Sequence, residues 1–167
     1  EMAPFAGVEA SEWTWGAAFL DVDLDGYDDL LLATGHGADM QDFDAAERIA
    51  QLRMKEPQLS AVVLMTNYPA LNPPNVAFRN RGNLTFEPAG STWGFNRPGI
   101  THGVILADLD NDGDLDVVTS DLNQSPGLYR NESNAPRIAV RLKSNGKQKN
   151  THGIGARIRL LTGKSAQ

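Results

Sequence analysis

The chain has 167 residues, of which 22% are charged, and a formal net charge of −6. A chain of this length can bury a sizeable core, and no stretch is long and apolar enough to span a bilayer. The absence of cysteine excludes disulfides, thiolate zinc sites and cysteine nucleophiles. No basic stripe is present, so we expect no nucleic-acid partner.

An acidic loop follows the first apolar run, which includes Ala17–Leu20. Residues 21–29 read DVDLDGYDD, which places aspartates at positions 1, 3, 5 and 9 and glycine at position 6. Calcium takes six to eight oxygen ligands, and this spacing turns alternate carboxylates toward one point. Glycine at position 6 permits the sharp turn. The loop therefore predicts a calcium site with the ligands Asp21, Asp23, Asp25, Asp29 and the main-chain carbonyl of Tyr27.

A change of composition marks residues 36–74 as an insertion. Asp44 to Glu47 has the pattern of a capping box before helix-forming sequence, and Pro57 should end that helix. The proline-rich stretch from Tyr68 to Asn75 predicts extended chain. The run from Ala61 to Met65 is too apolar to remain exposed to water. We therefore expect residues 42–74 to contact a protein partner or another part of the same polypeptide.

The acidic pattern recurs 87 residues later, in residues 108–116. Neighbouring carboxylates ~4–5 Å apart repel by roughly 3–4 kcal/mol at an effective dielectric of ~20, which a bound cation would offset. No lysine or arginine lies between Arg97 and Arg130 to supply a local counter-charge. Thr119 at position 12 excludes an EF-hand, which needs glutamate there. The predicted ligands are Asp108, Asp110, Asp112, Asp116 and the main-chain carbonyl of Asp114.

Further similarity supports an internal repeat. Apolar runs flank both loops and predict strands, and Phe78-Arg79-Asn80 resembles Tyr129-Arg130-Asn131. Phe78 follows Asp21 by 57 residues, whereas Tyr129 follows Asp108 by 21, so the first copy carries about 36 additional residues. One such loop could be a solvated turn rich in Asp and Gly. Two matched copies favour two structural Ca²⁺ sites, and weak sites of this kind fill where calcium is near millimolar, outside the cytoplasm.

The two loops and their strands resemble the FG-GAP/VCBS repeats of calcium-containing β-propellers. Residues 134–143 and 153–160 resemble the start of the ASPIC/UnbV domain, found in the cartilage acidic protein family. The Phe-Gly of the repeat is Trp15-Gly16 in the first copy and His102-Gly103 in the second. The resemblance implies an all-β, partial propeller with one helical insertion and a C-terminal β segment. The expected domains are a repeat at 1–35, the insertion at 36–74, a second repeat at 75–133 and the ASPIC/UnbV-like segment at 134–167.

Two repeats are fewer than the roughly four blades that a closed propeller needs. We therefore expect the chain to be part of a longer polypeptide, or to complete its sheet with a partner. Glu1 at the first position, without a visible signal peptide, indicates a mature or trimmed chain.

Two classes of function follow from these features. The first is a non-catalytic, extracytoplasmic interaction, adhesion or scaffold module, because no nucleophile motif accompanies the histidines. The alternative is a calcium-dependent enzyme, or a carbohydrate-recognising part of one, with its chemistry near His102 or in further blades. We expect His36, His102 and His152 to be structural or surface residues, and Trp13, Trp15 and Trp93 to anchor the core.

Overall fold

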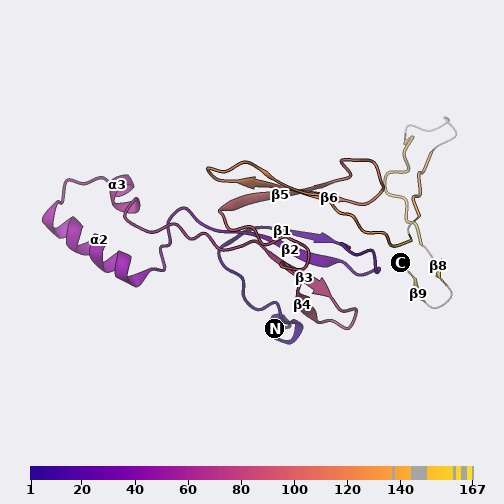
Figure 1. Cartoon of the computed structure of the whole chain (residues 1–167), viewed down its shortest axis with the longest axis horizontal. Helices are drawn as coiled ribbons and strands as arrows, with labels where there is room; N and C mark the ends of the chain where they lie inside the picture. The colour runs from indigo at the N-terminus through magenta and orange to yellow at the C-terminus, as the bar shows by residue number, and fades with distance from the viewer. Residues whose placement is uncertain (137, 144–149, 160, 163–164, 167) are drawn as a thin grey trace.

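A computed structural model describes residues 1–136, 138–143, 150–159, 161–162 and 165–166. Most of the regular structure in this part of the chain is antiparallel β-sheet, which confirms the all-β, partial propeller-like fold (Figure 1). One sheet has the order β1-β2-β3-β4, and a second has the order β5-β6-β7. Their strands are β1 (Thr14–Leu20), β2 (Asp29–Thr34), β3 (Val76–Asn80), β4 (Phe86–Pro88), β5 (Thr101–Ala107), β6 (Asp116–Asp121) and β7 (Gly127–Tyr129).

The two sheets repeat one another in register. Leu20 pairs with Asp29 in the first sheet, and Ala107 pairs with Asp116 in the second, 87 residues later in both strands. Both sheets have a register shift just before the glycine of the first strand, Gly16 or Gly103. The third strands also match, because β3 pairs with β2 in the first sheet and β7 pairs with β6 in the second. The internal repeat predicted from the acidic loops is therefore a structural repeat.

The core lies between the two sheets, because β1 packs beside β5 (Figure 1). A Cβ atom on Gly16 would lie 3.5 Å from Val104 Cγ1, so the backbone of β1 approaches the side chains of β5 closely. The linker before β5 contributes Phe95, and Trp93 packs against the cluster as predicted. The buried members of this core are Leu20, Leu31, Ala77, Phe95 and Val117.

The helical insertion leaves the first sheet after β2 and projects away from both sheets (Figure 1). It contains α2 (Phe43–Lys55) and α3 (Ala61–Met65), and the main chain closes at its base through a bridge between His36 and Leu71. The helix ends two residues before Pro57, as predicted. The predicted start is wrong: the side chain of Asp42 accepts a hydrogen bond from the Ala45 N–H at 2.8 Å, and Asp44 lies within the first turn.

Short elements stand at both ends of the chain. A four-residue helix, α1 (Ala3–Ala6), precedes β1 and was not predicted. The C-terminal β structure consists of β8 (Leu161–Thr162) and β9 (Ser165–Ala166). The described residues of 134–143 and 150–159 contain no strand, and residues 153–156 form a turn in which Ala156 N–H donates to Gly153 O at 2.8 Å. Residues 137, 144–149, 160, 163–164 and 167 of the predicted segment 134–167 lie outside the described part. The domain boundaries remain predictions.

Among the described residues, none of the helices has the length and apolarity that crossing a membrane requires.

Candidate metal centre

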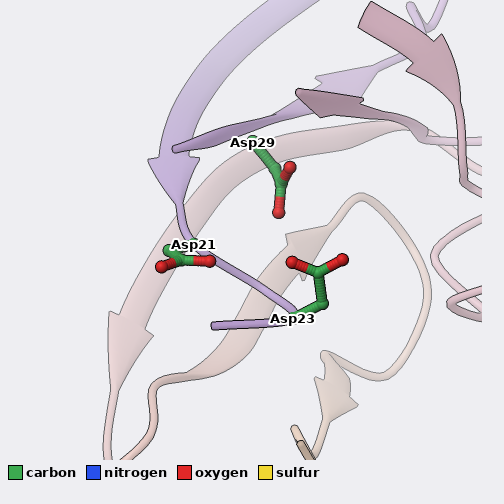
Figure 2. Close-up of side chains that lie close together, drawn as sticks. All are labelled: Asp21, Asp23 and Asp29. Atoms are coloured by element: carbon green, nitrogen blue, oxygen red, sulfur yellow. The ribbon is translucent and has the colours of Figure 1, made fainter. Parts of the chain in front are cut away.

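The first acidic loop connects β1 to β2 and brings three predicted ligands together. The carboxylates of Asp21, Asp23 and Asp29 each offer an oxygen atom within 4.8 Å of the others. Figure 2 shows the three side chains arranged around one shared space. The carboxylate of Asp25 lies outside this group and accepts hydrogen bonds from the Tyr27 N–H and from Arg79.

Backbone N–H groups hold the two end carboxylates of this loop in place. Asp21 accepts from the N–H groups of Asp25 and Gly26, both at 2.9 Å. Asp29, whose side chain is fully buried, accepts from Val22 N–H at 2.9 Å and from Asn80 N–H at 2.8 Å. The loop is therefore closed by its own carboxylates and by the end of β3.

The second loop connects β5 to β6 and repeats this bonding. Asp116 is buried and accepts from the N–H groups of Leu109 and Asn131, both at 2.9 Å, as Asp29 does in the first loop. Asp108 accepts from Gly113 N–H at 3.2 Å. The carboxylates within 4.8 Å of one another here are those of Asp108, Asp110 and Asp112, so the second loop gathers a different set of three.

The remaining predicted ligands were assigned through their main-chain carbonyls. Tyr27 has an exposed side chain, whereas the side chain of Asp114 is buried. Burial of the Asp114 carboxylate was not foreseen, because the sequence pattern assigns position 7 to the main chain. Coordination by either carbonyl remains a prediction.

Two arginines supply counter-charge that the local sequence does not show. Arg79 Nη2 lies 2.6 Å from Asp23 Oδ2 and 3.2 Å from Asp25 Oδ2. In the second repeat, Arg130 Nε lies 2.6 Å from Asp110 Oδ2. Arg79 lies near the end of β3 and Arg130 directly follows β7, and both pair with the aspartate at position 3 of their loop. The second loop has no counter-charge within the local sequence, as expected, and strand pairing delivers one arginine to each loop from outside it.

Burial dominates the electrostatics of the first loop. Desolvation, reinforced by the charges of Asp23 and Asp25, raises the pKa of Asp29 to about 6, although two backbone hydrogen bonds oppose the shift. Desolvation also raises the pKa of Asp21. Asp23 Oδ1 is buried and has no hydrogen-bond partner among the described residues. A cation in the shared space would pair with this oxygen and stabilise the ionised carboxylates, so the donor set fits a hard divalent ion.

A ring cluster lies where the first strands of the two repeats begin. The Trp15 ring stacks on His36, with centroids 5.7 Å apart, and meets His102 edge-on at 4.9 Å. Trp13 lies 4.5 Å from the His36 ring, and Trp15 Nε1–H donates to Gly35 O at 2.6 Å. Trp15 is exposed rather than a core anchor.

One comparison with known families gives a match. Residues 62–119 match the family model described as an FG-GAP-like repeat. The matched segment runs from α3 to the middle of β6 and includes the second acidic loop. No curated protein matches the chain.

The match supports the repeat family that the sequence predicted and, with the two sheets, indicates a β-propeller-type interaction module. The resemblance of the C-terminal segment to an ASPIC/UnbV domain remains a prediction.

Proposed function

We propose that this chain is a non-catalytic, extracytoplasmic interaction module whose two repeats are stabilised by calcium. The observation that carries the proposal is the convergence of three carboxylates in each loop, at matched places in two registered sheets. Three carboxylates within 4.8 Å of one another repel unless a cation or protons neutralise them. One arginine for each loop offsets part of that charge.

The ligands would be the residues that the spacing identified. In the first loop Asp21, Asp23 and Asp29 would supply carboxylate oxygens, with Asp25 and the Tyr27 carbonyl completing the site. Asp23 can pair with Arg79 and bind the ion at the same time, because Arg79 pairs with Oδ2 whereas Oδ1 has no hydrogen-bond partner among the described residues. In the second loop the carboxylates of Asp108, Asp110, Asp112 and Asp116 and the Asp114 carbonyl would act in the same way. The bound ion would neutralise charge and hold two strand ends together.

Isothermal titration with Ca²⁺ tests this assignment. We expect two ions per chain for the wild type, one for Asp21→Asn and one for Asp108→Asn. Asp44→Asn is the matched control, because Asp44 is an exposed aspartate in the first turn of α2, and it should still bind two. Absence of binding by the wild type, or two ions in either loop variant, would contradict the proposal.

The extracytoplasmic location follows from the expected strength of the sites. Loops of this type that lack the bidentate glutamate of an EF-hand should bind calcium in the weak range typical of extracellular modules. A dissociation constant far below ~10⁻⁵ M would remove this argument, because such a site would also fill inside cells.

The helical insertion is the element that we propose contacts a partner or another part of a longer polypeptide. It projects from the sheets (Figure 1), and Phe43 and Met54 on α2 are 88% and 83% exposed. Apolar side chains gathered on a projecting element commonly mark an interaction surface. Cryo-EM of the full-length assembly tests the idea. Residues 42–74 surrounded by solvent, without intermolecular contacts, would rule it out.

The exposed ring cluster favours a second candidate function, carbohydrate recognition, because sugars stack on exposed aromatic rings. Titration of the intrinsic tryptophan fluorescence with a panel of oligosaccharides would detect it. His102→Ala should abolish the response, since His102 touches Trp15, whereas His152→Ala should not. A panel without any response would remove this candidate.

A further inference from the structure

Val22 connects the three converging carboxylates of the first acidic loop. It lies between Asp21 and Asp23 in the sequence, so its backbone joins two of these carboxylates directly. Its N–H donates to Oδ2 of Asp29, the third carboxylate, at 2.9 Å. A change in the position of Val22 therefore affects all three side chains around the shared space in Figure 2.

The carbonyl of Val22 is bound by a residue of the second repeat. Asn131, which follows β7, donates from its Nδ2–H to Val22 O at 2.9 Å. The Asn131 Oδ1 accepts the N–H of Ser133 at 3.1 Å, and this second bond orients the amide with its nitrogen toward Val22. The first loop is therefore held in part by a side chain from outside its own sheet.

The same asparagine is fixed to the second acidic loop. Its N–H donates to Asp116 Oδ1 at 2.9 Å. The preceding residue, Arg130, places Nε 2.6 Å from Asp110 Oδ2. Asp110 and Asp116 are both predicted ligands of the second site. The position of Asn131 therefore depends on the conformation of the second loop, and the position of Val22 depends on Asn131.

We propose that Asn131 couples the two calcium sites, so that an ion bound at either site raises the affinity of the other. Without an ion, the carboxylates of each loop repel one another, and a bound ion fixes them in one arrangement. An ion in one loop also fixes its end of the bridge through Asn131. The second ion then binds to a loop that is already partly ordered, with a smaller loss of conformational entropy. Linkage requires the factor to be the same in both directions.

The equivalent asparagine of the first sheet shows what this coupling requires. The Asn80 N–H donates to Asp29 Oδ1 at 2.8 Å, as the Asn131 N–H does to the buried aspartate of the second loop. The Asn80 Nδ2–H, however, donates to Asp28 O at 2.9 Å, in the loop that its own main chain contacts. Asn80 therefore binds one loop, whereas Asn131 connects two, and Asn80 provides a matched control.

The coupling rests on the proposed calcium sites, and isothermal titration with Ca²⁺ distinguishes their failures. The overall constant for binding two ions to the wild type is divided by the product of the intrinsic constants of Asp21→Asn and Asp108→Asn, which each retain one site. The quotient is the coupling factor, and we expect about five, a size that one hydrogen bond supports. A chain that binds no calcium contradicts both proposals. Two bound ions with a factor of one or less contradict the coupling alone.

Substitutions of the asparagines assign the coupling to one side chain. Asn131→Ala should reduce the factor to about one, because the bond to Val22 is lost. Asn131→Asp is a second variant, which keeps the size and the acceptor for the Ser133 N–H and removes the donor. Each factor is calculated from single-site variants that carry the same substitution, so changes at one site alone cancel. Asn80→Ala should keep the wild-type factor. An unchanged factor in either Asn131 variant, or its loss in Asn80→Ala, would overturn the assignment.

Hydrogen exchange shows directly whether the second site acts on Val22. In Asp21→Asn only the second site can fill, and calcium should still slow exchange at the Val22 N–H in the first loop. The same addition of calcium should leave this exchange unchanged when Asn131→Ala is also present. Exchange at Val22 that is insensitive to calcium in Asp21→Asn, or equally slowed with and without Asn131, would contradict the bridge.

Discussion

At the scale of single residues, the two loops show how one backbone conformation accepts different side chains. Leu24 and Asn111 occupy the fourth position of their loops, with φ of 57° and 62°, and Gly26 and Gly113 share φ near 95°. Left-handed backbone suits Gly and Asn, whereas other L-residues adopt it at a cost of roughly 1–2 kcal/mol. The first loop therefore contains a strained leucine where the second has a well-suited asparagine.

Leu24→Asn should raise the free energy of unfolding by about 1 kcal/mol, because it relieves this strain at a half-buried position. Urea unfolding in chelator measures the change without contributions from calcium. The reverse substitution in the other repeat, Asn111→Leu, is the matched control and should lower the free energy by a similar amount. An equal loss of unfolding free energy in both variants would mean that the packing of Leu24 contributes more than its backbone strain costs.

The raised pKa of Asp29 predicts a dependence of stability on pH. The folded-state pKa is about 6 and the ordinary value is 3.8, so the folded form retains its proton to higher pH. The stability that protonated Asp29 contributes is complete below pH ~4 and is lost as the pH rises through ~6, which lowers the free energy of unfolding by about 3 kcal/mol. Urea unfolding in chelator at pH 4, 5, 6 and 7 should show this decline.

Saturating calcium should remove that decline, because the ion binds the deprotonated carboxylate and lowers its pKa. A decline of the same size with and without calcium would place Asp29 outside the metal site.

At the scale of elements, the start of α2 depends on one capping residue. Asp42→Ala should destabilise the first turn by about 1 kcal/mol, because the Asp42 side chain accepts the Ala45 N–H. Hydrogen exchange at Ala45 measures the loss locally and should accelerate about fivefold. Asp44→Ala, two residues later in the first turn, should change this exchange much less. Equal acceleration of hydrogen exchange in both variants would show that Asp44 contributes to the cap as much as Asp42 does.

The elements also show what could and could not be predicted from the sequence. Local patterns predicted the strands around each loop, because apolar runs and loop spacing are short-range signals. The ion pairs Arg79–Asp23 and Arg130–Asp110 join residues 56 and 20 positions apart in the sequence, so the spacing within each loop could not reveal them. The recurrence of Arg-Asn after both loops was the available signal. The cap was misassigned because Asp42 and Asp44 both precede helix-forming sequence.

At the scale of the whole molecule, one side chain joins the two repeats. Asn131 Nδ2–H donates to Val22 O in the first loop at 2.9 Å, whereas the equivalent Asn80 donates to Asp28 O in the loop of its own sheet. Each asparagine also accepts an N–H from two residues ahead. The two asparagines therefore differ mainly in whether the hydrogen bond that the side chain donates joins the two sheets.

Asn131→Ala should lower the free energy of unfolding by about 1 kcal/mol, because a part-buried hydrogen bond is lost. Hydrogen exchange should accelerate at Val22 and in β1, although the substitution lies in the second repeat. Asn80→Ala should cost a similar amount but leave exchange in β5, β6 and β7 unchanged. Acceleration confined to the second repeat in Asn131→Ala would show that this bond does not couple the sheets.

The central claim, that calcium stabilises both repeats, is tested most directly by the free energy of unfolding in calcium and in chelator. At a free calcium concentration of about 100 times the dissociation constant, each occupied site should add roughly 2.7 kcal/mol to the wild type. Asp110→Ala should lose the contribution of the second site in calcium and less than about 1 kcal/mol in chelator, because its ion pair with Arg130 is exposed. Equal free energies for the wild type in the two conditions, or equal losses for Asp110→Ala in both, would contradict the account.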